Sequence, residues 1–271
     1  MKKCLNTATT RGYPLQDDIM YCGMYGFTGM EIDTLKLDEY LAKNSPGDLK
    51  KEMEDAGIDF AALMAFPFTP FSDSPAGLEE IKKYSGLASS LGCRILLAYM
   101  SGKPQEGVSR EEALGSAVLA ATMYGDAARE SGLKVALEPI GRHPFMPGPA
   151  QALEVIEKSG HPSLGLVIDT FHCFRSGVSP SDLEAIPAGR ILMVHVNDSE
   201  DKPVEVLNDA NRLYPGKGIL PLGGYLQALE KNGYGGYVSV EIFRPEYWKD
   251  RHENIIRNAS ESLDIFLSRE E

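Results

Sequence analysis

LGLVID, at residues 164–169, is an apolar run that ends in a carboxylate. Three other runs end in Glu138, His195 or Glu241: KVALE (134–138), ILMVH (191–195) and YVSVE (237–241). All four are rich in Val, Ile and Leu, which is typical of parallel strands that are buried on both faces. If the four strands are neighbours, their last side chains converge at one edge of the sheet. One strand-end side chain that can bind a metal can arise by chance, but its repetition on four consecutive strands predicts a site.

Four more apolar runs precede these, and helical patterns separate the strands. The earlier strands are expected at residues 3–9, 27–33, 60–66 and 94–100. Helices are expected at 36–56, around 78–91, at 109–132, 149–159, from 179 onward, and at 221–232 and 250–268. The alternation predicts an α/β fold, a (β/α)8 TIM barrel, as a single domain over residues 1–271.

A doubly wound open sheet is the competing α/β architecture. Such sheets usually carry a glycine-rich turn directly after the first strand. Here the first strand leads instead into Thr9-Thr10-Arg11-Gly12-Tyr13. No phosphate-binding GxxxxGK[ST] loop is present either. The sequence therefore favours the closed barrel.

Composition and charge exclude several partners. The chain of 271 residues has a formal net charge of −12, which disfavours a nucleic-acid partner because phosphate contacts need a basic surface. No apolar run approaches the roughly 18 residues of a membrane span. The four cysteines form no CxxC pair, and the N-terminus turns polar too early for a signal peptide. A cytoplasmic location is expected, and nothing in the sequence indicates an oligomeric state.

The strand-end residues Glu138, Asp169, His195 and Glu241 are the candidate metal ligands. Active-site residues of a TIM barrel lie at the C-terminal ends of its strands. Three carboxylates and one imidazole suit one divalent ion such as Mn²⁺, Zn²⁺, Co²⁺ or Fe²⁺, and suit calcium less well. A helix cap or a core ion pair is the alternative for each residue alone. The set of four favours the metal.

Several nearby residues are candidates for other roles. His172 and Arg212 are expected to contact substrate, although a fifth ligand or a cap remains open for His172 and a solvated cation for Arg212. Trp248 and Phe66 are candidate walls of the pocket, and packing behind a loop is the alternative for both. Asp198 either orients His195 or caps a helix.

Such a site suits proton transfer next to a carbonyl. The metal polarises a ketone oxygen and a neighbouring hydroxyl as a Lewis acid. One carboxylate removes the proton α to the carbonyl, which gives a metal-bound enediolate, and the other returns a proton elsewhere. Glu138 and Glu241 are the acid and base candidates as well as ligands.

Five segments of the chain resemble a known family. They are LEPIG (137–141), VIDTFHCF (167–174), HVNDSED (195–201), RLYPGKG (212–218) and VSVEIFRPEYW (238–248). The combination is similar to the xylose-isomerase-like TIM-barrel family, which includes sugar epimerases, hydroxypyruvate isomerase and endonuclease IV. The similarity runs essentially end to end, and it is greatest to the branch that isomerises inososes.

The resemblance implies roles for individual residues. Glu138, Asp169, His195 and Glu241 fall on the metal-ligand positions of the family. His172 and Arg212 fall on positions that contact substrate in related epimerases, and Glu31 matches a recurrent acid whose role the sequence does not fix. The segment GRHPFMPGPAQ (141–151) departs from the inosose isomerases, because it is more apolar than their loop.

The expected function is that of a divalent-metal-dependent isomerase or epimerase of a keto-cyclitol or ketose, with 2-keto-myo-inositol favoured. Its partner is a small molecule. A ketose 3-epimerase and a 2-keto-myo-inositol dehydratase are the near alternatives. A non-catalytic sugar-binding barrel is a further alternative. An abasic-site endonuclease is remote, because that activity resembles a three-metal site rich in histidine and this acidic chain has five histidines.

Overall fold

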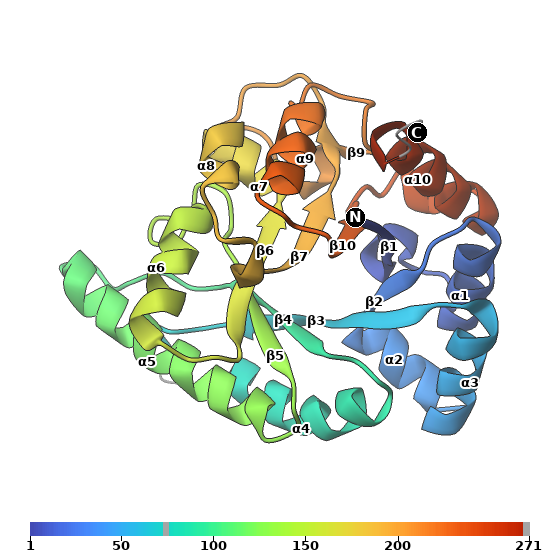
Figure 1. The fold of residues 1–271 in the computed structure, drawn as a ribbon, viewed down its shortest axis with the longest axis horizontal. Helices are drawn as coiled ribbons and strands as arrows, with labels where there is room; N and C mark the ends of the chain where they lie inside the picture. The colour runs from blue at the N-terminus through green and yellow to red at the C-terminus, as the bar shows by residue number, and fades with distance from the viewer. Residues whose placement is uncertain (73–75, 268–271) are drawn as a thin grey trace.

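A closed barrel of parallel strands forms the centre of the molecule, in a computed structural model that describes residues 1–72 and 76–267. Within that range its eight strands are β1 Lys2–Asn6, β2 Gly29–Asp33, β3 Asp59–Phe68, β4 Ile95–Met100, β5 Lys134–Glu138, β6 Leu164–Asp169, β7 Ile191–Val196 and β10 Tyr237–Val240. They follow the order β1-β10-β7-β6-β5-β4-β3-β2, and the parallel pairing of β1 with β10 closes the ring (Figure 1). The predicted (β/α)8 barrel is confirmed.

Helices surround the barrel (Figure 1). The α-helices are α1 Leu15–Met24, α2 Thr34–Leu41, α3 Pro46–Ala56, α4 Ala76–Ser90, α5 Arg110–Arg129, α6 Pro149–Ser159, α7 Thr170–Arg175, α8 Pro180–Glu184, α9 Leu222–Lys231 and α10 His252–Leu267. Short 3₁₀ helices lie at η1 Thr7–Thr10, η2 Ala188–Arg190, η3 Asp209–Asn211 and η4 Tyr247–Lys249. A small antiparallel pair, β8 Asp198–Ser199 and β9 Arg212–Leu213, follows β7 at the barrel mouth.

The strands divide their side chains between two cores. Successive side chains of a strand point to opposite faces, so alternate residues face the helices or the barrel interior. The outward set, which includes Leu137, Ile168 and Val194, packs with the helices in the larger apolar cluster. The inward set forms a smaller cluster inside the barrel, together with Ala8 of η1. Its strand residues are Cys4, Ala61, Ala62, Met64, Leu97, Ala136, Val167 and Met193. This inner cluster is the floor on which the polar residues of the mouth rest.

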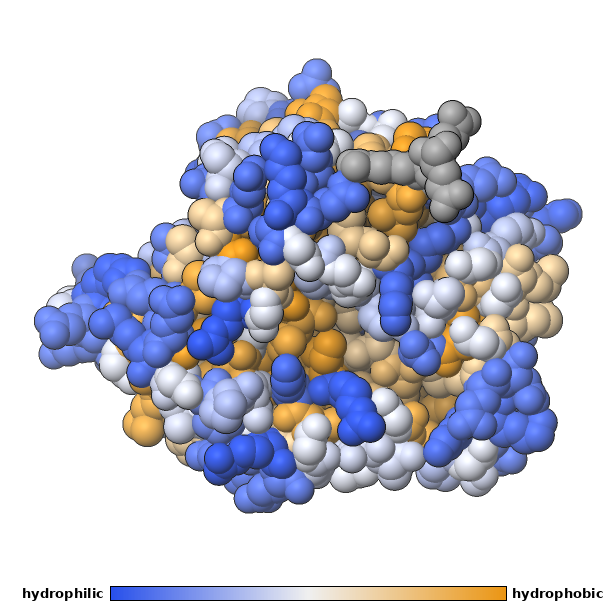
Figure 2. Space-filling view, viewed as in Figure 1, coloured by the Kyte–Doolittle hydropathy of each residue, from blue (hydrophilic) through white to orange (hydrophobic). Residues whose placement is uncertain are grey.

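The surface is polar over the outer helices. Figure 2 shows hydrophilic side chains around the periphery of the viewed face and apolar ones gathered nearer its middle. Among the described residues, no helix combines the length and the apolar character that crossing a membrane requires.

Some predicted boundaries were wrong. The segment 36–56 forms two helices, because Ser45 caps the start of α3 and Pro46 occupies its first position. The first strand ends at Asn6 rather than at residue 9, because the Asn6 side chain accepts a hydrogen bond from the Ala8 amide and begins η1. Helices α1 and α7 were not expected from the hydrophobic pattern.

Candidate metal centre and active site

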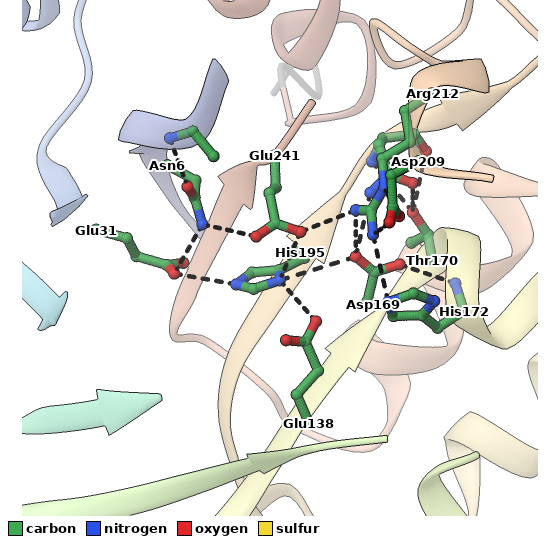
Figure 3. A network of polar contacts seen from close by, with 12 residues as sticks. Asn6, Glu31, Glu138, Asp169, Thr170, His172, His195, Asp209, Arg212 and Glu241 are labelled. Atoms are coloured by element: carbon green, nitrogen blue, oxygen red, sulfur yellow. Dashed lines mark hydrogen bonds and ion pairs between the residues drawn. The ribbon is translucent and has the colours of Figure 1, made fainter. Parts of the chain in front are cut away.

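Four strand-end side chains meet at the mouth of the barrel. Glu138, Asp169, His195 and Glu241 each offer a ligand atom, and these atoms lie within 4.8 Å of one another. Glu138 and Asp169 end β5 and β6, His195 is the second-to-last residue of β7, and Glu241 directly follows β10. All four are buried, and Figure 3 shows their polar ends pointing toward one another. The structure therefore assembles the set of candidate ligands that the sequence indicated.

Strand register accounts for this convergence. Asp169 lies opposite His195 on adjacent strands, and Ser239 of β10 lies on the other side of His195. Glu241 is two residues beyond Ser239, so it occupies the next inward position. Glu138 likewise lies two residues beyond Ala136 of the barrel interior. The four residues thus form one layer above the inner apolar cluster.

His195 lies at the centre of the carboxylates. Its Nδ1 is 3.1 Å from Glu138 Oε1 and 3.2 Å from Glu241 Oε2, and its Nε2 is 3.0 Å from Glu31 Oε2. Burial alone would lower the pKa of the imidazole, but the charges of Glu241, Glu31 and Glu138 outweigh burial and raise that pKa well above its usual value. The mouth therefore has a strong preference for positive charge.

The carboxylates themselves differ in their electrostatic environment. Burial raises the pKa of Glu138 to about 7, although the neighbouring His195 opposes the rise. Burial acts in the same direction on Asp169, but the charges of Arg212, His172 and His195 outweigh it and lower the pKa of that carboxyl. Asp169 is therefore the more firmly ionised of the two.

Arg212 enters the site from the small β8–β9 pair. Its Nη1 donates to Asp169 Oδ2 at 2.7 Å and to Glu241 Oε2 at 2.8 Å. Its Nε donates to Asp209 Oδ1 at 3.0 Å, and its Nη2 lies 3.3 Å from His172 Nε2. The arginine is 1% exposed, so it is a buried cation within the carboxylate cluster and not a solvated one.

The loop between β9 and α9 needs glycine to hold this arrangement. A Cβ at Gly218 would lie 2.1 Å from the carbonyl oxygen of Ser199 and 2.6 Å from Asp198 Oδ1. Asp198 Oδ1 accepts from the backbone amides of Ser199 and Leu220. Asp198 therefore holds the loop in place. Of the two roles that the sequence left open for it, orienting His195 is not observed in the described structure, where the ring nitrogens of His195 face Glu138 and Glu31.

His172 follows Asp169 on α7. Its backbone amide donates to Asp169 Oδ1 at 2.9 Å, so the aspartate caps the helix and also faces the cluster. Because a guanidinium only donates, His172 Nε2 must accept from Arg212, which places the ring proton on Nδ1. That Nδ1 is buried and has no partner within the described part of the chain. It is a donor available to a ligand.

The donor set fits a divalent ion. Three carboxylates and an imidazole are the oxygen-rich, nitrogen-containing set that Zn²⁺, Mn²⁺, Co²⁺ and Fe²⁺ accept. In the described structure, four buried carboxylates, including Glu31, surround one guanidinium and one imidazole. A dication balances that excess negative charge without requiring His195 to remain protonated.

Two further polar residues of the mouth contact the cluster. Asn6 Nδ2 donates to Glu31 Oε2 at 3.2 Å and to Glu241 Oε1 at 3.0 Å. The sequence had indicated Glu31 without a role, and Asn6 was missed. Asn6 lies two residues after the inward-facing Cys4, so strand alternation could have placed it at the mouth.

The two candidate pocket walls differ in position. Phe66 is fully buried in the outer apolar cluster, and its ring centroid lies 6.0 Å from that of Tyr84 on α4. It therefore faces the helices and not the mouth. The expectation that it contacts substrate was wrong, because its strand position points outward. Trp248 donates from Nε1 to the Ala8 carbonyl at 3.1 Å, and the Arg11 guanidinium covers its ring at 5.3 Å. It lies beside η1, and its contact with substrate stays a prediction.

Comparison with known proteins places the chain among TIM barrels. Residues 21–267 match a family model described as xylose isomerase-like TIM barrel. The chain is 36% identical over 276 residues to inosose isomerase of Halalkalibacterium halodurans, with 99% of this chain and 97% of that protein covered. It is 26% identical to 3-dehydroshikimate dehydratase of Pseudomonas putida, of which it spans 42%.

A solved structure is similar over the same extent. It is described as the IOLI protein with a binding zinc atom. The two folds superpose with a TM-score of 0.92 at 32% sequence identity, and 98% of each chain is covered.

Proposed function

The chain belongs to the xylose isomerase-like TIM barrel family, and we propose that within it the chain is a divalent-metal-dependent isomerase of a keto-cyclitol, with 2-keto-myo-inositol the favoured substrate. The observation that carries this proposal is the buried cluster of three carboxylates and one imidazole at the barrel mouth. Full-length similarity to an inosose isomerase supports the substrate class.

Glu138, Asp169, His195 and Glu241 would hold the ion. When bound, a divalent ion at this position polarises a carbonyl oxygen and so acidifies the neighbouring C–H. Arg212 holds Asp169 and Glu241 in place through its two short Nη1 contacts. The burial of the cluster excludes bulk water, which strengthens each of these interactions.

Glu138 and Glu241 would transfer the proton. They extend from β5 and β10, which are separated in the barrel by β6 and β7, so they approach a bound ring from different sides. One carboxylate takes the proton from the carbon next to the ketone, and the other delivers a proton to the former carbonyl carbon. The neighbouring hydroxyl gives up its O–H proton and the former carbonyl oxygen gains one, so the carbonyl and the hydroxyl exchange places and no redox cofactor is consumed.

His172, Arg212 and Trp248 would orient the substrate. His172 presents a buried Nδ1–H that no described side chain accepts, and a substrate hydroxyl oxygen would satisfy it. Arg212 adds positive charge beside the same position. The indole of Trp248 would cover one face of the ring.

A substrate panel tests the proposal. Purified protein loaded with Zn²⁺ or Mn²⁺ is incubated with keto-cyclitols and ketoses, and products are followed by NMR. We expect 2-keto-myo-inositol to give an isomeric inosose faster than any open-chain ketose gives its 3-epimer. Faster turnover of a ketose would show that open-chain ketoses, and not keto-cyclitols, are the substrate class. No turnover of any compound would reject the proposed function.

A dehydratase is the second candidate, favoured by the full-chain similarity to 3-dehydroshikimate dehydratase. Elimination begins with the same removal of a proton next to a carbonyl, after which a hydroxyl group departs as water. The two outcomes differ in mass, because isomerisation conserves it and dehydration loses one water. Mass spectrometry of the products from 2-keto-myo-inositol separates them.

A further inference from the structure

Glu31 contacts the cluster of candidate ligands through His195. It lies in the middle of β2, paired with Asn6 of β1, and is not one of the four candidate ligands. Its Oε2 lies 3.0 Å from His195 Nε2, on the opposite side of the ring from Glu138 and Glu241. Both Glu31 and His195 are 0% exposed, so this contact is made without competition from water.

The carboxylate of Glu31 is costly to bury, which argues against a purely structural role. Its Oε1 is buried and has no hydrogen-bond partner among the residues that the structure describes. A buried polar atom without a hydrogen-bond partner destabilises a fold, and more so where the group is charged. An apolar side chain would fill this position at lower cost.

Asn6 fixes the orientation of the neighbouring groups. Its Oδ1 accepts from the Ala8 backbone amide at 2.9 Å, so its Nδ2 must face the carboxylates. The two N–H groups of Nδ2 donate to Glu31 Oε2 and to Glu241 Oε1. The reversed amide would direct a carbonyl oxygen at two carboxylates. Asn6 therefore joins Glu31 to one of the candidate ligands in a single defined geometry (Figure 3).

We propose that Glu31 and Asn6 are positioning residues that prepare His195 and Glu241 for a metal ion. A carboxylate accepts the proton of His195 Nε2, which leaves the lone pair of the ring on Nδ1, the atom that faces the cluster. Asn6 engages Glu241 Oε1 and leaves Oε2 directed at the same point. This inference rests on the metal-binding part of the proposed function and assigns a role to a pair outside the ligand set.

Metal affinity is the direct test, and it does not depend on catalysis. Zn²⁺ binding to the full-length protein is measured by competition with a chromogenic chelator, for wild type and for Glu31→Gln, Glu31→Ala and Asn6→Asp. Loss of an outer hydrogen-bond partner of a metal ligand typically weakens binding about 10- to 100-fold. We expect that loss for both Glu31 variants, and at least as large a loss for Asn6→Asp, because its added carboxylate faces two others.

Asp33→Asn is the matched control. Asp33 ends the same strand and also loses one negative charge in this variant, but its side chain caps α2 through the Leu35 amide and does not contact His195. We expect wild-type affinity for it. Equal weakening by Asp33→Asn and Glu31→Gln would overturn the proposal, because a general charge effect would then explain both.

The tautomer of His195 gives a second readout. In Zn²⁺-loaded protein, ¹⁵N NMR is expected to show the proton on Nε2 and the metal on Nδ1, with a changed Nε2–H signal in Glu31→Gln. If wild type binds Zn²⁺ and Glu31→Gln binds it equally well with an unchanged His195 spectrum, the positioning role is rejected and the metal site stands. If wild type does not bind Zn²⁺, the proposed function fails and this inference fails with it.

Discussion

At the scale of single residues, the main feature of the barrel mouth is its concentration of buried negative charge. His195 contacts Glu31, Glu138 and Glu241, while Arg212 contacts Asp169 and Glu241. Buried carboxylates so close together repel one another unless cations lie between them. Arg212 is one such cation that the chain itself supplies, and the site has the donors to hold another. We therefore expect substitutions of the carboxylates to reduce turnover and substitution of the buried cation to reduce stability.

Replacing either proposed acid/base residue should abolish most turnover. Glu138→Gln and Glu241→Gln keep the shape of the side chain but lose its basicity, so kcat at saturating metal is expected to fall roughly 100- to 10,000-fold. Glu154→Gln is a suitable control, because Glu154 lies on α6 and pairs with Arg110 at the surface. A kcat within twofold of wild type in both site variants would contradict the assignment.

Removing the buried cation should destabilise the fold. Arg212→Met leaves Asp169 and Glu241 without their guanidinium partner in a region shielded from water. Breaking one side of a buried ion pair typically costs about 3–5 kcal/mol, and we expect this loss in the free energy of unfolding measured with urea in metal-free buffer. Arg110→Met, which breaks an exposed ion pair with Glu154, should cost under about 1 kcal/mol. Equal effects of the two variants would refute the structural role of Arg212.

The sequence predicted the candidate ligands because they end strands, a placement visible from hydrophobic runs alone. It could not settle contacts that depend on distant segments meeting. Asp198 illustrates this limit, since its partner Leu220 lies in a loop whose path is not local. Asn6 belongs to the same class, because its carboxylate partners come from the second and last strands of the barrel.

At the scale of elements, capping signals predicted boundaries better than hydrophobic spacing did. Ser109 and Glu112 form the expected capping box at the start of α5, and α6 spans the predicted residues 149–159. The prediction placed a single helix over residues 36–56, although Ser45-Pro46 carries the signal that begins α3. The prediction also placed Phe66 wrongly. The strand β3 has a register shift between Leu63 and Phe66, and strand alternation in the sequence does not reveal it.

Close packing of α4 on β3 predicts opposite effects for two glycines of one helix. A Cβ at Gly77 would lie 1.8 Å from the Pro67 carbonyl oxygen and 2.6 Å from the Tyr124 hydroxyl. Gly77→Ala must therefore displace the helix, and overpacking of this kind costs typically about 1–3 kcal/mol. Nothing lies within 4 Å of a Cβ at Gly86, so Gly86→Ala should stabilise the helix by up to about 1 kcal/mol. Thermal unfolding of the two variants checks the signs, and a stabilising Gly77→Ala would contradict the packing.

At the scale of the whole molecule, barrel closure brings the site together. Its candidate ligands come from β5, β6, β7 and β10, and the positioning pair comes from β1 and β2. Parallel pairing of β1 with β10 is the step that sets Asn6 beside Glu241, across almost the full length of the chain. An ion held by four strands and supported by two more therefore depends on the closed barrel and not on any single βα unit.

The most direct measurement follows the proton itself, with and without metal. Protein stripped by a chelator is mixed with 2-keto-myo-inositol in D₂O, and deuterium uptake next to the carbonyl is followed by ¹H NMR before and after adding one equivalent of Zn²⁺ or Mn²⁺. The account predicts no uptake above the buffer rate for stripped protein and rapid uptake, with formation of an isomeric inosose, after the metal is restored. Equal uptake by stripped and loaded protein, or none by either, would contradict it.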